Sequence, residues 1–274
     1  SSEKMHATKL PGNLSIGKTG DPELAYKVGQ LLAEELSALG FNMNFAPVAD
    51  VNTNPDNPVI GSRSFGSDHE MVGDMVAKMV EGLQSKNVCS VIKHFPGHGD
   101  TSDDTHTGSV IINHSRERLE TVEFIPFKKG IQSGADGVMT AHIQVPEITR
   151  NSLPATLSYD VLTGILRNDM NFNKLIITDA LEMEAISKYW PPAEAAVNAF
   201  IAGADILLMP ASLEDAYTGL LEAVRDGRIS QERLDQSVRR ILMVKAERSI
   251  LEPGEKDIDP ENVLGCKDHL NISP

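Results

Sequence analysis

The sequence is poor in cysteine and has fewer basic than acidic residues. Its two cysteines, Cys89 and Cys266, are too few for a disulfide framework, and they do not decide between a cytoplasmic and a secreted bacterial protein. Lys and Arg number 25 against 39 Asp and Glu, a formal net charge of -14. Such a surface would repel nucleic acid and anionic membranes, which excludes both as expected partners. No apolar run reaches membrane-spanning length, and no internal repeat is present.

What the sequence does contain is an alternation of short apolar runs with segments of helical periodicity. The first helix is well delimited, because Asp21 is a favoured N-cap residue and Pro22 suits the first helical position. Repeated alternation of this kind predicts a parallel sheet with helices outside it. Strands are predicted at 42–48, 90–94, 137–142, 174–178 and 204–209, and helices at 22–39, 70–85, 119–133, after Ser158, and at 192–202, 213–225 and 230–248.

Polar residues follow four of these predicted strands, namely Asp50, His94, His142 and Asp179. In a closed barrel all the strand ends surround one mouth, whereas in an open sheet the functional groups gather at one switch point. Residues 1–250 are therefore predicted to form a (β/α)8 TIM-type barrel, an α/β fold, with residues 251–274 as a C-terminal extension. Only about five strands are evident where a barrel needs eight, so the barrel is expected to be incomplete.

The densest chemical segment is 93–101, with Asp103, Asp104 and His106 shortly after it. It leaves a strand and enters a loop rich in Gly and Pro, where catalytic groups are common. One interpretation is a sugar or acyl site, in which Lys93 and His94 bind hydroxyl groups and an Asp/His pair transfers protons. A second is a polar loop whose side chains bond only to backbone. A third is a metal site, because imidazole and carboxylate are good ligands for zinc or iron, formed by His94, His98, Asp100 and His106.

Asp104 and His106 are two residues apart, so on an extended segment their side chains point the same way. A carboxylate beside an imidazole fixes its tautomer and raises its basicity. An ordinary salt bridge within the loop would give the same spacing, and the residues alone leave both interpretations open.

Asp179 directly follows a buried strand, where it could act as a nucleophilic carboxylate or cap the next helix. Arg63, in a turn-rich loop, could bind a carboxylate or sugar hydroxyls, or lie exposed without a role. His142 could point into the same mouth or form hydrogen bonds that are purely structural. Position alone favours a helix cap at Asp179, an exposed Arg63 without a role, and structural hydrogen bonds at His142.

Taken together, four ordered motifs resemble the β-N-acetylglucosaminidases of glycoside hydrolase family 3. The resemblance extends from about Leu10 to about Ile250. The segments that carry it are 44–51 with 54–55 and 60–65, the KHFPGHG segment at 93–99 with Asp104 and His106, 138–143, and 177–183.

The resemblance implies a retaining β-N-acetylglucosaminidase that removes terminal N-acetylglucosamine from oligosaccharides or smaller glycosides derived from cell walls. Asp179 would be the nucleophile that forms a covalent glycosyl-aspartate, and His106, oriented by Asp104, the general acid/base. No metal or organic cofactor is implied. Phosphorolysis in place of hydrolysis is a possible variant of this reaction. The residues implied to bind hydroxyl groups of the terminal sugar are Arg63, Lys93 and His94.

The family's first strands and a sugar-binding Asp in a DQEGG segment have no counterpart before Leu10. We therefore expect a barrel that is incomplete at its N-terminus, with a neighbouring chain or a further N-terminal segment completing it. Two other functions are carried as alternatives. One is a metal-dependent hydrolase that uses the His/Asp cluster, and the other is a sugar-binding fragment without turnover.

Overall fold

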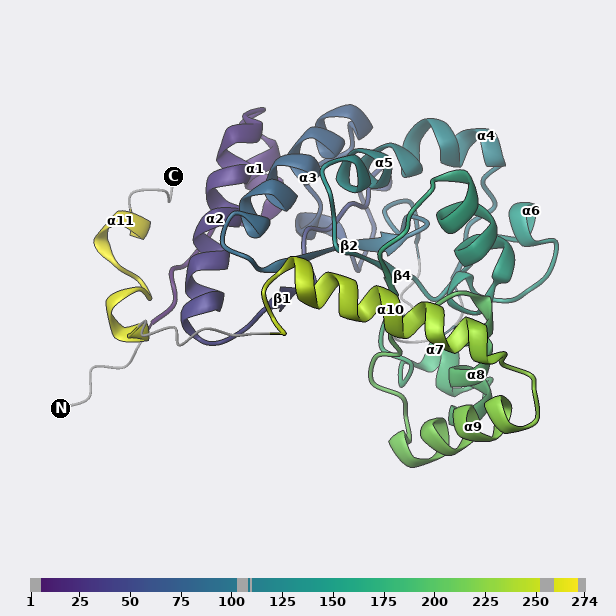
Figure 1. Ribbon diagram of the computed structural model, residues 1–274. Coiled ribbons are helices and arrows are strands. Elements are labelled where there is room, and N and C mark those ends of the chain that lie inside the picture. The colour runs from purple at the N-terminus through teal and green to yellow at the C-terminus, as the bar shows by residue number, and fades with distance from the viewer. Residues whose placement is uncertain (1–5, 103–107, 109, 252–258, 271–274) are drawn as a thin grey trace.

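A parallel β-sheet lies at the centre of the molecule, with helices packed against it (Figure 1). The computed structural model describes residues 6–102, 108, 110–251 and 259–270. Adjacent strands are parallel throughout the four-stranded sheet. The prediction of an α/β fold built on a parallel sheet is confirmed. In sheet order the strands are β1 (Met43–Asn44), β2 (Cys89–Phe95), β4 (Gly137–Thr140) and β6 (Leu175–Ile177).

The helices that connect these strands follow the predicted ones closely. The Asp21 side chain accepts a hydrogen bond from the Glu23 amide at 3.0 Å, so the predicted N-cap is confirmed. The main helices are α2 (Pro22–Ala38), α3 (His69–Gln84), α5 (Phe124–Gln132), η4 (Asp160–Asp169), α8 (Pro192–Ala202), α9 (Leu213–Arg225) and α10 (Gln231–Glu247). Shorter elements are α1 (Asn13–Gly17), η1 (Gly61–Arg63), α4 (Arg116–Arg118), η2 (Leu119–Glu123), α6 (Pro146–Thr149), η3 (Ala155–Leu157), α7 (Glu184–Ser187), η5 (Pro260–Asn262) and α11 (Lys267–Leu270).

Two predicted strands are less regular than expected. In the predicted strand 42–48, regular pairing covers only β1, followed by one bridge from Val48 to Lys93. Pro47 interrupts the ladder because it has no N–H to donate. The predicted strand 204–209 is reduced to a single parallel bridge between Ile206 and Ile177. Over the described residues, the sheet does not close on itself.

A second, two-stranded parallel sheet was not predicted. It pairs β3 (Val110–Ile111) with β5 (Ile143–Gln144). Two-residue strands carry too little periodicity to be recognised in a sequence.

Aromatic packing fixes helix α5 against the sheet. Phe95, at the end of β2, is fully buried and stacks on Phe124 with 5.4 Å between ring centroids. Its edge-to-face partner is Phe127, at 5.2 Å. Such pairs contribute about 0.5–1.5 kcal/mol beyond their buried area, so the end of β2 is held rigidly where it enters the loop at 96–101.

A buried carboxylate holds the opposite ends of the strands together. Asp136 immediately precedes β4 and is fully buried. Its oxygens accept hydrogen bonds from Gln84 at the end of α3, from the Ser90 amide of β2, and from Lys174 just before β6. Arg248, just after α10, donates from Nε to both oxygens at 3.1 Å and from Nη2 to Oδ1 at 2.9 Å. One acid therefore connects four elements at the N-terminal edge of the sheet.

Candidate active site

Four polar side chains meet at the C-terminal edge of the sheet. Asp50 follows the Val48 bridge, His94 lies at the end of β2, His142 follows β4 and Asp179 follows β6. Because these strands are parallel and adjacent, their C-terminal ends lie on the same edge. In α/β barrels this edge carries the active site.

Asp50 organises the segment that carries most of the candidate site residues. It is fully buried, and its Oδ1 accepts a hydrogen bond from the His98 amide at 2.7 Å. The His94 amide approaches both carboxylate oxygens, at 3.2 and 3.3 Å, and His94 Nδ1 lies 2.7 Å from Oδ2. Burial acts to raise the pKa of Asp50, but His94 and His98 outweigh it and the net shift is downward. Asp50 is therefore held ionised.

Asp50 was not among the site residues predicted from the sequence. Its place after a strand was visible, but nothing in the sequence gave the three donors that converge on it. They come from residues 44 and 48 positions further along the chain.

His94 is fixed in one tautomer by its two neighbours. Arg63 Nη2 lies 3.4 Å from His94 Nε2, and a guanidinium can only donate, so Nε2 accepts. The ring proton is then on Nδ1, which donates to Asp50. Arg63 itself is exposed, and its Nη1 also donates to the Val59 carbonyl at 3.3 Å. The structure thus brings together Arg63 and His94, two of the three predicted sugar-binding residues.

Lys93, the third of these residues, lies between charges of both signs. Burial lowers its pKa and the positive charge of Arg63 lowers it further, while Asp179 and Asp50 act to raise it. These influences show that Lys93 is close enough to both Arg63 and Asp179 to interact with each.

Asp179 is half-buried after β6, and its Oδ1 accepts a hydrogen bond from the adjacent Ala180 amide at 2.8 Å. The next helix, α7, begins at Glu184 with Met183 as its N-cap residue. Asp179 therefore does not cap this helix, and the structural alternative for this residue is wrong. Its negative charge acts to raise the pKa of Lys93, His98 and His142, although burial lowers the pKa of all three.

His142 is a buried support for the Asp179 segment. Its Nε2 donates to the Ala180 carbonyl at 2.9 Å, because a carbonyl can only accept, and its Nδ1 lies 2.8 Å from Thr156 Oγ1. Burial lowers its pKa. His142 was expected either to point into the mouth of the barrel or to form structural hydrogen bonds, and its contacts are structural hydrogen bonds.

The loop after β2 is anchored by a further set of polar contacts. Asn57 Nδ2 donates to the His98 carbonyl at 2.8 Å, and His98 Nδ1 lies 2.8 Å from Thr101 Oγ1. Thr53 Oγ1 donates to Asp100 Oδ1 at 2.6 Å. The loop is thus held up to Thr101, directly before the predicted dyad. Asp104 and His106 lie outside the described residues.

The contacts of the described residues do not form a metal site. His94 uses both ring nitrogens on Asp50 and Arg63, and His98 Nδ1 faces Thr101. Within residues 6–102, 108, 110–251 and 259–270, no three His, Cys, Asp or Glu side chains could hold one ion.

The described part of the chain contains no helix with the length and hydropathy needed to cross a membrane.

Comparison with known proteins places the chain in a family. Residues 2–244 match the model of the "Glycosyl hydrolase family 3 N terminal domain". The chain belongs to glycoside hydrolase family 3, and the family named from its motifs is confirmed. Its open parallel sheet with surrounding helices is part of the TIM-barrel-like fold of this domain, so the predicted fold class is confirmed as well.

Individual relatives agree with this assignment. The chain is 37% identical over 265 residues to beta-hexosaminidase A of Pseudoalteromonas piscicida, covering 88% of this chain and 44% of that protein. A solved family 3 beta-N-acetylglucosaminidase from Paenibacillus sp. str. FPU-7 is 42% identical, with a TM-score of 0.94, and the match covers 99% of this chain and 52% of that one. The beta-glucoside phosphorylase BglX is 31% identical with a TM-score of 0.93, covering 97% and 50%. The chain spans about half the length of these relatives.

Proposed function

We propose that the protein acts as a retaining β-N-acetylglucosaminidase on oligosaccharides or smaller glycosides derived from cell walls. The observation that carries this proposal is the position of Asp179, a half-buried carboxylate after β6 with Lys93 beside it and no helix to cap. A nucleophilic carboxylate needs this combination of access and nearby positive charge. Similarity to the family 3 beta-N-acetylglucosaminidase from Paenibacillus favours an N-acetylglucosaminide as substrate.

The reaction has two steps. In the first, a carboxylate oxygen of Asp179 bonds to the anomeric carbon while the bond to the leaving oxygen breaks, and His106 gives its proton to that oxygen. In the second, a water oxygen attacks the same carbon, passes a proton to His106 and releases Asp179 as a carboxylate. Asp104 would hold the His106 ring in the tautomer that this exchange needs.

Arg63, Lys93 and His94 would bind hydroxyl groups of the terminal sugar. At His94, a sugar hydroxyl would donate to Nε2 in place of Arg63, whose contact with that nitrogen is long at 3.4 Å. The support for this role is geometric, since Asp50 fixes the His94 backbone and ring, and His94 in turn meets Arg63. A preorganised polar wall loses little freedom when it binds substrate, so more of its binding energy is available to the transition state.

The test is turnover of an aryl N-acetylglucosaminide by wild type and by Asp179→Asn. We expect Asp179→Asn to lower kcat by about 10³ or more while leaving the melting temperature nearly unchanged, because the nucleophile is lost but its shape is kept. Glu182→Gln, at an exposed position three residues away, is the matched control and should retain full turnover. Near-wild-type kcat in Asp179→Asn would refute the assignment.

A second measurement separates covalent catalysis from sugar binding without turnover. A fluorinated N-acetylglucosaminide whose glycosyl-enzyme hydrolyses slowly should add one sugar mass to the peptide that contains Asp179. A sugar-binding fragment would bind N-acetylglucosamine, release no aryl alcohol and acquire no adduct. Turnover in phosphate buffer distinguishes hydrolysis from phosphorolysis, since only the latter yields a sugar 1-phosphate.

A further inference from the structure

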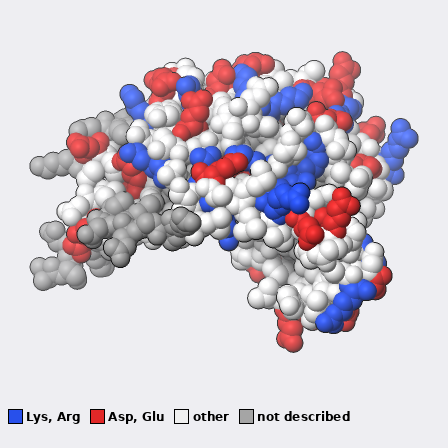
Figure 2. Space-filling model, in the orientation of Figure 1, with Lys and Arg blue, Asp and Glu red and all other residues white. Residues whose placement is uncertain are grey.

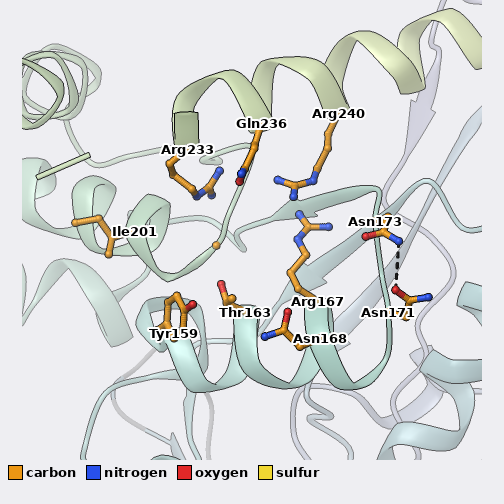
Figure 3. Close-up of a pocket in the computed structure, with 11 residues that line it drawn as sticks. Tyr159, Thr163, Arg167, Asn168, Asn171, Asn173, Ile201, Arg233, Gln236 and Arg240 are labelled. Atoms are coloured by element: carbon orange, nitrogen blue, oxygen red, sulfur yellow. Dashed lines mark hydrogen bonds between the residues drawn. The ribbon is translucent and has the colours of Figure 1, made fainter. Parts of the chain in front are cut away.

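A pocket of about 520 Å³ lies between η4 and α10 (Figure 3). It is at the opposite edge of the sheet from the candidate active site. Asn171 and Asn173, which line it, precede β6, whereas Asp179 follows that strand. At the usual rise per residue, the six residues from Asn173 to Asp179 span at most about 20 Å. The volume falls in the range of small-molecule sites.

Three arginines dominate the lining of this pocket, with no acidic residue among the lining side chains. In Figure 3 the guanidinium groups of Arg167, from η4, and Arg240, from α10, face each other across the pocket, and Arg233 lies beside them. Figure 2 shows basic side chains gathered on the surface over α10, in a protein whose net charge is -14. The other lining residues are Tyr159, Thr163, Asn168, Asn171, Asn173, Ile201, Gly203 and Gln236.

One buried carboxylate lies behind the three arginines. Asp205 bonds to Arg167 Nη2, and its Oδ1 lies 3.1 Å from Arg240 Nη1 and 3.8 Å from Arg233 Nη1. It also accepts from the Ser237 hydroxyl and from the Ile176 amide. Three guanidinium charges against one carboxylate leave a local charge of +2.

The arginines differ in how fully their donors are used. Arg167 donates to the carbonyls of Phe172 and Lys174 and to Asp205, so it is largely committed to protein groups. Arg233 is committed in the same way, to Ser237 and to the carbonyls of Phe200 and Ala204. Arg240, whose side chain is 22% exposed, makes a single hydrogen bond to the described residues, from Nη1 to Asp205. Its remaining donors are available at the pocket.

We propose that this pocket binds a phosphate group, either as the free ion or as part of a small phosphorylated molecule. The charge of +2 matches a phosphate dianion, and the uncommitted guanidinium donors of Arg240 fit a pair of phosphate oxygens. The side-chain amides of Asn168, Asn173 and Gln236 can both donate and accept hydrogen bonds. They could therefore bind hydroxyl groups of the molecule that carries the phosphate. Burial, together with the positive charge of Arg240, lowers the pKa of Arg167 to about 10 despite Asp205, so an added anion would relieve mutual repulsion.

The competing explanation is that the arginines only neutralise Asp205 and hold α10 against the sheet. Calorimetric titration of wild type with sodium phosphate and with glucose 6-phosphate, at constant ionic strength, distinguishes the two. We expect saturable binding of one equivalent at concentrations up to about 10 mM. Similar affinities for both probes identify the free ion as the ligand, and tighter binding of glucose 6-phosphate identifies a phosphorylated molecule. An absence of saturable binding by either would overturn the proposal.

Matched variants locate the binding. Arg240→Gln should weaken phosphate binding about tenfold or more, since it removes a charged donor pair. Arg239→Gln, the next residue of α10 and outside the pocket, should bind as wild type does. Arg63→Gln should also bind normally, which excludes the candidate active site as the source of the signal. Equal loss in Arg240→Gln and Arg239→Gln would refute the assigned site.

Asn168→Asp provides an independent test should Arg240→Gln fold poorly. Asn168 is exposed, lines the pocket and takes no part in the Asp205 contacts, so the change adds a negative charge without disturbing the buried pairs. Weaker phosphate binding is expected, and the same change at exposed Asn87, outside the pocket lining, should have no effect. Unchanged binding in Asn168→Asp would count against the proposal.

Discussion

The interactions of Asp50 make a quantitative prediction about stability. Asp50→Asn keeps the size and shape of the side chain, so packing is unaffected, but the charge disappears and an NH₂ group replaces one acceptor. That NH₂ must face either the His98 amide or the His94 ring, both of which donate to Asp50 in the structure. Hydrogen bonds to a charged group contribute about 1.5–3 kcal/mol each, so losing one and weakening the others should cost roughly 2–4 kcal/mol.

The assay is urea unfolding followed by circular dichroism, with a thermal melt as a check. A loss of this size should lower the melting temperature by about 5–12 °C in a domain of this length. Asp68→Asn is the matched control. Asp68 caps α3 by accepting from the Met71 amide at 2.8 Å, and because Asn caps helices about as well, its free energy of unfolding should change by less than about 0.5 kcal/mol. If Asp50→Asn were as stable as Asp68→Asn, the reasoning about Asp50 would be wrong.

The other predictions concern leaving groups, pH and packing. His106→Ala should reduce turnover of glycosides with poor leaving groups far more than that of activated aryl glycosides, because only the former need protonation, and equal losses would contradict the acid/base role. Burial lowers the pKa of His98 and His142, so in acid the unfolded state binds more protons than the folded state. The melting temperature should therefore fall as the pH decreases below about 6.5 and stay level above it, and His142→Asn should flatten this dependence. Phe95→Ala should cost roughly 3–5 kcal/mol in urea unfolding because it empties the fully buried stack on α5, and a loss below about 1 kcal/mol would show that the site can collapse.

The sequence predicted the sheet better than it predicted its irregularities. Parallel strands with intervening helices follow from the alternation of apolar periods, and Cys89–Phe95 and Leu175–Ile177 were found where runs of β-branched and apolar residues occur. The segment at 204–209 looks like a strand for the same reason, yet only Ile206 forms a bridge. Apolar content predicts burial, whereas ladder pairing depends on a neighbouring backbone that the sequence does not specify.

The candidate site was predictable only in part, because it also depends on contacts between residues that are distant in the sequence. Asp179 could be placed at the end of a strand, but only the structure separates it from the cap of α7. The resemblance implied that Arg63, Lys93 and His94 bind the terminal sugar. The structure places Arg63 against His94, and the sugar-binding role stays a prediction. Asp50 was undervalued because its importance comes from the convergence of distant donors, which no local pattern encodes.

The carboxylate of Asp136 has a consequence for how the protein opens. It bonds directly to Gln84, Ser90, Lys174 and Arg248, so separating any of these four segments from the sheet removes a hydrogen bond from a buried charge. In hydrogen–deuterium exchange, the amides of β2, β4 and β6 should therefore exchange at one common slow rate, through unfolding of the whole unit. The C-terminal end of α10 should share this protection, although much of its surface faces water, because Arg248 follows it directly.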